Sequence, residues 1–258
     1  MRIVSLVPSI TELLCDLDLA DQLVGRTGFC VHPWETVREI PKLGGTKDLK
    51  LDRIRELEPT HVVVNVDENR KADAEALATF VPHVIVTHPQ GPRDNPALFR
   101  QMGEAFGRQR EAAELCERFE AAYERATATV AERGDEQRVL YLIWRDPWMT
   151  VAPDTYIAQT LALFGWHNQP LSFCNPQGDK RTRARYPEVD PTEFRGRVDR
   201  VLLSSEPFHF KGEHVAEVEA LVPGAAVSLI DGEMTSWYGS RAIAGLEYLD
   251  EYTASCSL

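Results

Sequence analysis

The chain has 258 residues, of which 43% are hydrophobic, and its formal net charge is −12. This length can hold one large domain or two modest domains with hydrophobic cores. The acidic balance argues against a nucleic-acid partner, because phosphate binding needs a basic face. No apolar run approaches the roughly 20 residues that span a bilayer, so the sequence predicts a globular protein that is not embedded in a membrane.

The first predicted strand begins close to the start of the sequence. Ile3 to Val7 lead directly into a helix that starts around Pro8 and Ser9. A secretory signal combines a basic start, an apolar run and a small-residue cleavage site, and this stretch lacks that pattern. The five cysteines form no C-x-x-C pair, which suits a reducing compartment. We therefore expect a cytoplasmic protein as the sequence stands; the alternative is a periplasmic or cell-surface protein whose native start was trimmed.

Short β-branched runs alternate with polar helical segments in the first part of the chain. The runs at 61–65 and 83–88 flank a helical segment at 68–79. Continuous runs of this kind are typical of strands buried on both faces of a parallel sheet. Residues 1–94 are therefore predicted to form an N-terminal α/β lobe, whose first helix opens with a capping box of Ser9 and Glu12.

Residues 95–134 are predicted to be a helical linker. No strand pattern occurs in this stretch, and a break near Gly107 precedes one long helix over 112–132. The α/β alternation then resumes in a C-terminal lobe, residues 135–258. The sequence thus predicts an α/β protein, with two α/β lobes of mainly parallel sheets joined by a long backbone helix. In the second lobe we expect strands at 138–144, 200–204 and 226–230. We expect helices at 155–164, 191–195, 213–221 and 240–252.

Aromatic and polar side chains occur where the predicted strands end. In an open parallel sheet the carboxyl ends of the strands form the ligand crevice, and a flat amphipathic ligand needs aromatic faces and a few fixed polar groups there. The candidate ligand-binding residues are Phe29, Cys30, His32, Asp67 and Glu68 in the first lobe, and Trp144, Arg145, Trp148, Arg185, Tyr186, His209, Trp237, Tyr238 and Arg241 in the second.

Several candidates have a plain structural alternative. Trp144 can pack in the core, His32 can hydrogen-bond to loop carbonyls, and Glu68 can favour the dipole of the helix that follows it. The sequence alone leaves both readings open for these residues.

Arginines accompany the aromatic candidates, although the chain as a whole is acidic. Lys180, Arg181 and Arg183 form a basic run that can equally be a solvated loop. A guanidinium pairs bidentately with carboxylate or phosphate and stacks on rings, so Arg185, like Arg145 and Arg241, favours a ligand that carries negative groups.

Four motifs in the first lobe follow one another in the order of a known family. They are V-S-L-V-P-S-I-T-E-L-L, L-V-G-R-T-G-F-C-V-H-P, K-L-G-G-T-K-D and L-D-R-I-R-E-L-E-P-T-H-V-V-V. From Arg2 to about Tyr252 the chain resembles the cobalamin- and siderophore-type substrate-binding proteins of ABC importers, the helical-backbone metal receptors, and most closely their cobalamin-binding branch. The resemblance implies two lobes bridged by a long helix, a ligand in the cleft between them, no required cofactor and no enzymatic activity. Because one frame serves cobalamin, haem, iron chelates and bare metals, the ligand stays open.

The resemblance also implies roles for single residues. Phe29 occupies an aromatic position of the cobalamin binders and Tyr186 that of a second-lobe tryptophan, whereas Thr46 stands where a tryptophan would cover the ligand. Asp52 and Glu193 match the two acidic residues, one in each lobe, that family members offer to arginines of the membrane transporter. The implied partners are a small-molecule ligand, such as cobalamin or another metal chelate, and an ABC-importer membrane subunit.

Two other functions stay open from the residues. Cys30 and His32 have the chemistry to ligate a bare transition metal, or to act as nucleophile and base of a cytoplasmic enzyme. A second candidate metal cluster consists of Glu206, His209, Glu213 and His214. Neither cluster has the paired spacing of a structural zinc site, and the chain lacks G-x-S-x-G, Walker and G-x-G-x-x-G patterns, so no catalytic residue and no definite metal ligand is predicted.

Overall fold

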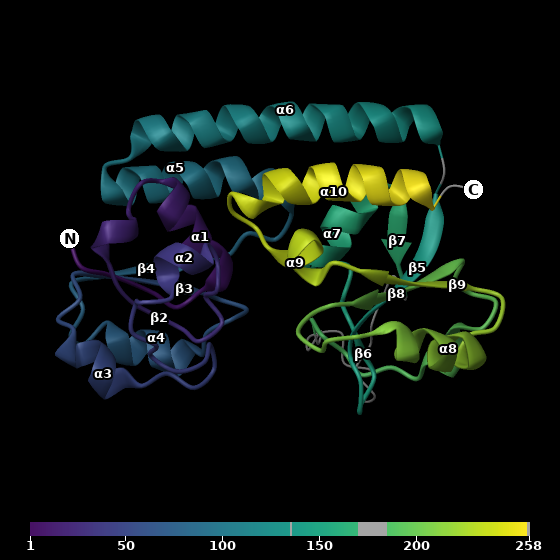
Figure 1. The fold of residues 1–258 in the computed structure, drawn as a ribbon, viewed down its shortest axis with the longest axis horizontal. Coiled ribbons are helices and arrows are strands. Elements are labelled where there is room, and N and C mark those ends of the chain that lie inside the picture. Colours follow the sequence, from purple (N-terminus) through teal and green to yellow (C-terminus); the bar gives the residue numbers. More distant parts are fainter. Residues whose placement is uncertain (135, 170–184, 257–258) are drawn as a thin grey trace. The chain divides into compact units, whose positions relative to one another are not determined.

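The computed structural model describes residues 1–134, 136–169 and 185–256. The chain divides into two compact units (Figure 1). Unit 1 comprises Met1–Pro89, Arg93–Glu120 and Tyr238–Arg241, and unit 2 comprises the rest. The long helix α6 (Gln109–Arg133) contributes residues to both units. It follows α5 (Asn95–Phe106), which ends where Gly107 adopts a left-handed conformation.

Unit 1 is built on a four-stranded parallel sheet in the order β2-β1-β3-β4. The strands are β1 (Ile3–Ser5), β2 (Leu23–Arg26), β3 (His61–Asn65) and β4 (His83–Thr87). The other helices of this unit are α1 (Pro8–Asp16), α2 (Trp34–Val37), α3 (Leu51–Glu56), α4 (Lys71–Leu77), and the 3-10 turns η1 (Ala20–Gln22) and η2 (Pro92–Asp94), the last of which starts in unit 2.

The core of unit 1 explains the β-branched run of β3. The expected burial on both faces is wrong for the run at 83–88, because β4 lies at the edge of the sheet and Val86 is 50% exposed. Val62 and Val64 of β3 are buried against Ile54 of α3 and Leu77 of α4. Figure 1 shows α3 and α4 on one side of the sheet and α1 and α5 on the other. Strands covered on both faces cannot alternate apolar and polar residues, which is why the sequence pattern predicted this sheet.

The predicted capping box of the first helix is wrong. Helix α1 begins at Pro8 with Val7 as its N-cap, and no side chain caps it. Proline lacks an N–H and has a fixed φ suited to the first helical position, so it starts the helix before Ser9. Thr11 instead hydrogen-bonds to the Val7 carbonyl at 2.9 Å.

Unit 2 contains a second, mainly parallel sheet in the order β6-β5-β8-β9, with β7 also paired to β5. Its strands are β5 (Gln137–Trp144), β6 (Met149–Thr150), β7 (Trp166–Asn168), β8 (Arg200–Ser204) and β9 (Ala226–Ile230). Among the described strands of this sheet, β6 alone runs antiparallel to its neighbour, β5. The helices are α7 (Tyr156–Leu163), η3 (Pro191–Phe194), α8 (Gly212–Leu221), α9 (Gly232–Ser236) and α10 (Arg241–Ser255). The predicted parallel α/β organisation is confirmed in both units.

A polar network joins the strands of unit 2 inside its core. The Asn168 side chain accepts a hydrogen bond from the Tyr141 amide at 2.7 Å and donates to the Val151 carbonyl at 2.6 Å. The Tyr141 hydroxyl meets Ser204 of β8 at 2.9 Å. Burial raises the pKa of Tyr141 well above its ordinary value, so the phenol stays protonated and can donate.

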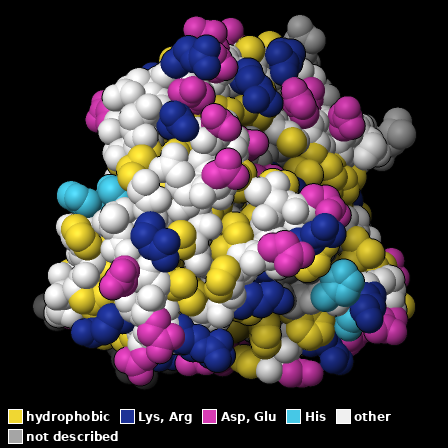
Figure 2. Space-filling view, turned by 60° about the vertical axis from the view of Figure 1, so that its left-hand side comes forward, with side chains coloured by type: hydrophobic (Ala, Val, Ile, Leu, Met, Phe, Trp, Pro, Cys, Tyr) yellow, Lys and Arg dark blue, Asp and Glu magenta, His cyan; other side chains and the backbone are white. Residues whose placement is uncertain are grey.

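The described part of the chain contains no helix with the length and apolar character needed to cross a bilayer. On the face drawn in Figure 2, basic side chains are interspersed with acidic ones, and hydrophobic side chains lie among them. The net charge of −12 is therefore not gathered into one acidic block on that face.

Two histidines stack at the amino ends of β3 and β4. His61 and His83 are paired in the parallel register, and their ring centroids lie 4.6 Å apart. Burial, the neighbouring His83 and the amino terminus of the chain together lower the pKa of His61.

We predict that mild acid destabilises unit 1 through His61. Because the pKa of His61 is lower in the folded than in the unfolded chain, the unfolded chain binds more protons below its ordinary value of 6.5. The free energy of unfolding should fall as the pH is lowered from about 7.5 through the folded-state pKa of His61. Urea melts of His61→Asn should show a flatter pH dependence than the parent, whereas the exposed control His209→Asn should not. Equal pH dependence of His61→Asn and the parent would contradict this assignment.

Candidate ligand-binding site

The carboxyl ends of the strands of unit 1 lie at one edge of its sheet. Parallel pairing puts Ser5 beside Arg26 and beside Val63, so the loops after β1, β2 and β3 leave from the same side. The first-lobe candidates Phe29, Cys30 and His32 follow β2, and Asp67 and Glu68 follow β3. The structure therefore brings these loops to the edge where parallel sheets bind ligands.

Cys30 is a structural residue of the loop after β2. Its side chain is buried, and its sulfur lies 3.1 Å from the Thr27 hydroxyl. Burial raises the pKa of the Cys30 thiol, which disfavours the thiolate that nucleophilic or metal-binding chemistry requires. Phe29, in contrast, is 62% exposed, and His32 is half-buried.

Two asparagines, Asn65 and Asn69, shape the loop after β3. Asn65 accepts hydrogen bonds from the amides of Asp67 and Glu68 at 2.8 and 3.3 Å. Asn69 donates to the Leu6 carbonyl at 3.2 Å, which ties this loop to the end of β1. Their signal was present in the sequence, because short amide side chains after a strand commonly bond to nearby backbone groups.

Asp67 and Glu68 are both engaged within unit 1. An Asp67 oxygen lies 3.6 Å from Nε2 of His88, and its carbonyl accepts a hydrogen bond from Lys47 at 2.7 Å. Helix α4 begins only at Lys71, with Arg70 as N-cap, so Glu68 does not cap it. Glu68 instead accepts a hydrogen bond from the Tyr238 hydroxyl at 2.7 Å.

A short segment from the C-terminal part of the chain, Tyr238–Arg241, belongs by its contacts to unit 1. Burial and the Glu68 carboxylate raise the pKa of Tyr238 well above its ordinary value. The Arg241 guanidinium pairs with both oxygens of Glu12 at 2.7 Å, and the two side chains are only 12% and 17% exposed. Any role of Arg241 toward a ligand stays a prediction, and a negative ligand would have to share this guanidinium with Glu12.

Gly239 allows this segment to approach α1. Its φ is +84°, a conformation that side chains disfavour, and a Cβ there would lie 3.2 Å from the Ser9 carbonyl oxygen. The Gly239 amide donates to the Asn95 side chain at 2.7 Å.

The second-lobe tryptophans lie at the carboxyl edge of the unit 2 sheet. Trp144 ends β5, is 39% exposed and meets the ring of Phe208 edge-on at 5.8 Å. Trp148 stacks on Phe210 at 6.0 Å with nearly parallel planes. Arg145, between them in sequence, pairs with Glu217 at 2.8 Å, and its contact with a ligand stays a prediction.

Glu206 joins the loops that follow β8 and β9. One of its oxygens accepts hydrogen bonds from the Trp237 indole at 2.8 Å and from the Ser236 hydroxyl at 2.7 Å. Burial raises the pKa of Glu206, and the two hydrogen bonds partly offset that effect. The loops approach so closely that a Cβ on Gly232 would lie 2.5 Å from the Ser204 hydroxyl. Glu206 therefore holds Trp237, which is largely buried, in place.

The remaining ligand candidates of unit 2 are His209, after β8, and Arg185 and Tyr186, on a segment that pairs alongside β6. His209 is exposed, and its Nδ1 lies 3.2 Å from the Ser205 carbonyl oxygen. The Arg185 carbonyl accepts a hydrogen bond from Ala152 at 2.8 Å, and the next residue, Tyr186, is 38% exposed. Lys180, Arg181 and Arg183 lie outside the described residues.

The metal clusters considered from the sequence do not assemble in the described residues. There, no three histidine, cysteine or acidic side chains come together in a way that could hold a metal ion. His214 instead accepts a hydrogen bond from the Lys211 amide at 2.8 Å, at the start of α8.

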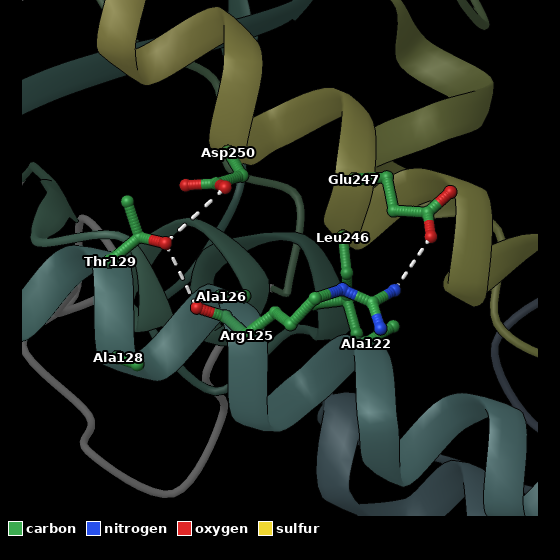
Figure 3. A pocket seen from close by; sticks show the side chains of 8 residues that line it. All are labelled: Ala122, Arg125, Ala126, Ala128, Thr129, Leu246, Glu247 and Asp250. Carbon is green, nitrogen blue, oxygen red and sulfur yellow. Dashed lines mark hydrogen bonds and ion pairs between the residues drawn. The ribbon is translucent and has the colours of Figure 1, made fainter.

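A cavity of about 310 Å³ lies between α6 and α10 in unit 2 (Figure 3). Alanines of α6 and Leu246 line it, and the pairs Arg125–Glu247 and Thr129–Asp250 bridge the two helices across it. Its residues come from none of the loops that follow the strands. Small side chains where two helices meet account for it, and it is not the candidate ligand site.

The two residues that resemble transporter-docking acids are both exposed. Asp52 lies in the first turn of α3 and Glu193 lies in η3. Asp190 caps η3 by accepting a hydrogen bond from the Thr192 amide at 2.9 Å. The Glu193 side chain is therefore not required as the cap, and its docking role stays a prediction.

Comparison with known proteins identifies the family. The model of the periplasmic binding protein family matches residues 3–168. The chain belongs to this family. A vitamin B12-binding protein of Pectobacterium carotovorum is 24% identical over 172 residues, which cover 65% of this chain and 60% of the relative's length. The chain thus spans less than two thirds of that relative.

Two solved structures share the fold. The periplasmic heme-binding protein RhuT of Roseiflexus sp. RS-1 superposes with a TM-score of 0.82 at 20% identity, covering 100% of this chain and 99% of that one. The periplasmic vitamin B12-binding protein BtuF of Vibrio cholerae has a TM-score of 0.82 at 15% identity, with 98% and 96% covered. The expected family resemblance and the expected fold are confirmed. Because the family consists of binding proteins, the expectation of a non-enzyme that needs no cofactor is confirmed as well.

The expectation of a cytoplasmic protein is wrong. It depended on where the sequence begins and on its cysteine pattern, and neither determines the compartment in which the folded chain works. The matching family is one of periplasmic binding proteins, and both solved relatives are periplasmic. The family indicates the periplasm instead.

We predict that the Arg241–Glu12 pair contributes substantially to stability. Arg241→Met leaves the Glu12 carboxylate largely buried without its partner, which should cost about 2–3 kcal/mol of unfolding free energy. The matched control is Arg125→Met at the Arg125–Glu247 pair, whose side chains are 61% and 56% exposed. That change should cost less than about 1 kcal/mol. Equal losses in urea melts of the two variants would show that burial does not strengthen the Arg241 pair.

Proposed function

We propose that the protein binds a planar metal chelate, a corrinoid or a heme, as the solute-binding component of an ABC importer. The observation that carries the proposal is the set of exposed rings at the carboxyl edge of the unit 1 sheet and around β5 and β6 of unit 2. Phe29 in unit 1 and Trp144 and Tyr186 in unit 2 are 62%, 39% and 38% exposed. Large aromatic side chains left open at such an edge suit the flat face of a macrocycle.

The potential metal-ligating side chains of the described residues favour a chelate over a bare metal ion as the ligand. The thiol of Cys30 is buried and the described residues hold no ready metal-ion cluster, whereas a chelate brings its own equatorial ligands. The names of the relatives support the same class of ligand, because they bind vitamin B12 or heme. A propionate or a nucleotide tail would supply the negative groups that Arg145, Arg185 and Arg241 are proposed to contact.

The importer partner is proposed from the family and from two exposed acids. Asp52 in α3 and Glu193 in η3 present one carboxylate from each unit to solvent. Such acids can pair with arginines of a membrane subunit, and the charge pairing would speed their association at low salt.

Titration of the purified protein with hemin and with cyanocobalamin tests the proposed function. Binding of either ligand should quench tryptophan fluorescence at micromolar concentration, because Trp144, Trp148 and Trp237 lie near the proposed site. Ligand at about 100 times its Kd should stabilise the fold by about 2.7 kcal/mol and raise Tm.

Cobalt(II) and iron(III) salts serve as matched control ligands, and they should produce neither effect. If both chelates leave fluorescence and Tm unchanged, the proposed function fails. If a free metal salt alone raises Tm, the protein is a bare-metal binder.

A further inference from the structure

Arg26, the last residue of β2, is among the largest fully buried side chains of the protein. Its Nε donates to the Val37 carbonyl at 2.7 Å, and its Nη1 donates to the carbonyls of Thr27 and Cys30 at 3.1 and 3.0 Å. All three described partners are neutral. Burying a guanidinium costs desolvation energy that an apolar side chain would avoid, so its value lies in the geometry it imposes.

The three carbonyls belong to the segment that carries the two exposed rings, Phe29 and Trp34. Thr27 and Cys30 belong to the loop after β2, and Val37 is the last residue of α2. The Arg26 backbone adds two more hydrogen bonds, from its amide to Pro41 at 3.0 Å and to its carbonyl from Leu43 at 2.8 Å. One residue therefore holds the beginning, the middle and the end of the segment from 27 to 37.

Two aromatic side chains project from this segment. Phe29 is 62% exposed and Trp34, the first residue of α2, is 50% exposed. The Phe29 ring is supported on one side by Gly45, where a Cβ would lie 3.3 Å from it. Because large rings are usually buried, two open rings on one tightly held segment require an explanation.

We propose that Arg26 is a positioning residue that holds Phe29 and Trp34 as a two-ring apolar platform for the chelate, and that Trp34 is itself a ligand contact. The inference deepens the proposed function and rests on it. The sequence analysis did not select Trp34, because this residue does not directly follow a strand. It lies beyond the loop after β2, at the start of α2. We assign Trp34 to the site because its ring is exposed and because Arg26 anchors α2 through the Val37 carbonyl.

The first test replaces Trp34, which is 50% exposed. Trp34→Ala should raise the Kd for hemin or cyanocobalamin about 10-fold, because stacking and buried apolar area are both lost. The matched control is Glu35→Ala on the same helix, whose side chain is 78% exposed and pairs with Arg38. That variant should bind like the parent. If Trp34→Ala binds within about 2-fold of the parent, Trp34 is not a ligand contact.

The second test asks whether Arg26 acts through Trp34. Arg26→Lys keeps the charge, but a single ammonium on an unbranched chain cannot satisfy three carbonyls in fixed directions. It should weaken binding in the parent and have a clearly smaller effect in the Trp34→Ala background, since one of the two rings it positions is then absent. Arg108→Lys is the control, because Arg108 also donates to carbonyls, those of Leu17 and Asp18, at a point before β2 begins. It should lower Tm and leave the Kd unchanged.

The outcomes separate the inference from the proposed function. If the parent binds a chelate and Arg26→Lys lowers only Tm, or adds its full effect to Trp34→Ala, Arg26 has a general structural role and the positioning claim is overturned. An Arg26→Lys chain that does not fold also removes that claim, and Trp34→Ala still decides the ligand contact. If the parent binds neither hemin nor cyanocobalamin, both the proposed function and the platform fail.

Discussion

Parallel strand pairing is the constraint on which the rest of the structure depends. In unit 1, β1 pairs with β3 so that Ser5 lies beside Val63, and in unit 2, β5 pairs with β8 so that Leu142 lies beside Leu203. Parallel neighbours require the chain to return over the sheet, so helices cover its faces and the loops after the strands leave from one edge. A slip of one residue would turn buried valines and leucines toward the opposite face. The pairing therefore determines both the core and the position of the candidate site.

The edge loops are held by a few buried polar groups. Arg26 donates hydrogen bonds to three carbonyls after β2, and Asn69 ties the loop after β3 to Leu6. Glu206 accepts hydrogen bonds from the side chains of Trp237 and Ser236. Each satisfied hydrogen bond contributes only about 1 kcal/mol, whereas a buried group that loses its partner costs about 1–3 kcal/mol. These groups thus specify one loop conformation more than they add stability, and preorganised loops lose less entropy when a ligand binds.

The consecutive residues Trp237 and Tyr238 each bond to an acid. Trp237 donates to Glu206 within unit 2, and Tyr238 donates to Glu68 within unit 1. Both acids follow a parallel strand by two or three residues. Each acid therefore anchors its aromatic partner within its own unit.

Much of the fold could be predicted because long apolar runs carry strong signals. The strands at 61–65, 200–204 and 226–230 have the predicted bounds, since each is a β-branched or leucine-rich run paired in a parallel sheet. The first two are largely buried, whereas 226–230 lies at the edge of its sheet and is partly exposed. The two-residue β6 and the three-residue β7 were missed, because segments so short show no periodicity and form only against a neighbouring strand.

The candidate site was predictable in part. Phe29 and Trp144 could be selected because aromatic residues at the ends of strands are informative, and Tyr186 was selected from the family resemblance. The contacts of Tyr238 with Glu68 and of Arg241 with Glu12 join residues 170 and 229 positions apart, and local pattern carries no information about such pairs. Glu206 had a local signal, as an acid directly before a proline in the turn after β8, but its role emerges only from the indole that packs against it.

Hydrogen–deuterium exchange with and without hemin or cyanocobalamin tests the central claim, that the ligand is held by loops at the carboxyl edges of the two sheets. The account predicts slower exchange in the ligand-bound protein at residues 27–34, 66–70, 144–148, 205–210 and 231–238. Amides along the α6–α10 cavity should exchange at unchanged rates. Protection confined to α6 and α10, with the strand-end loops unaffected, would contradict the account.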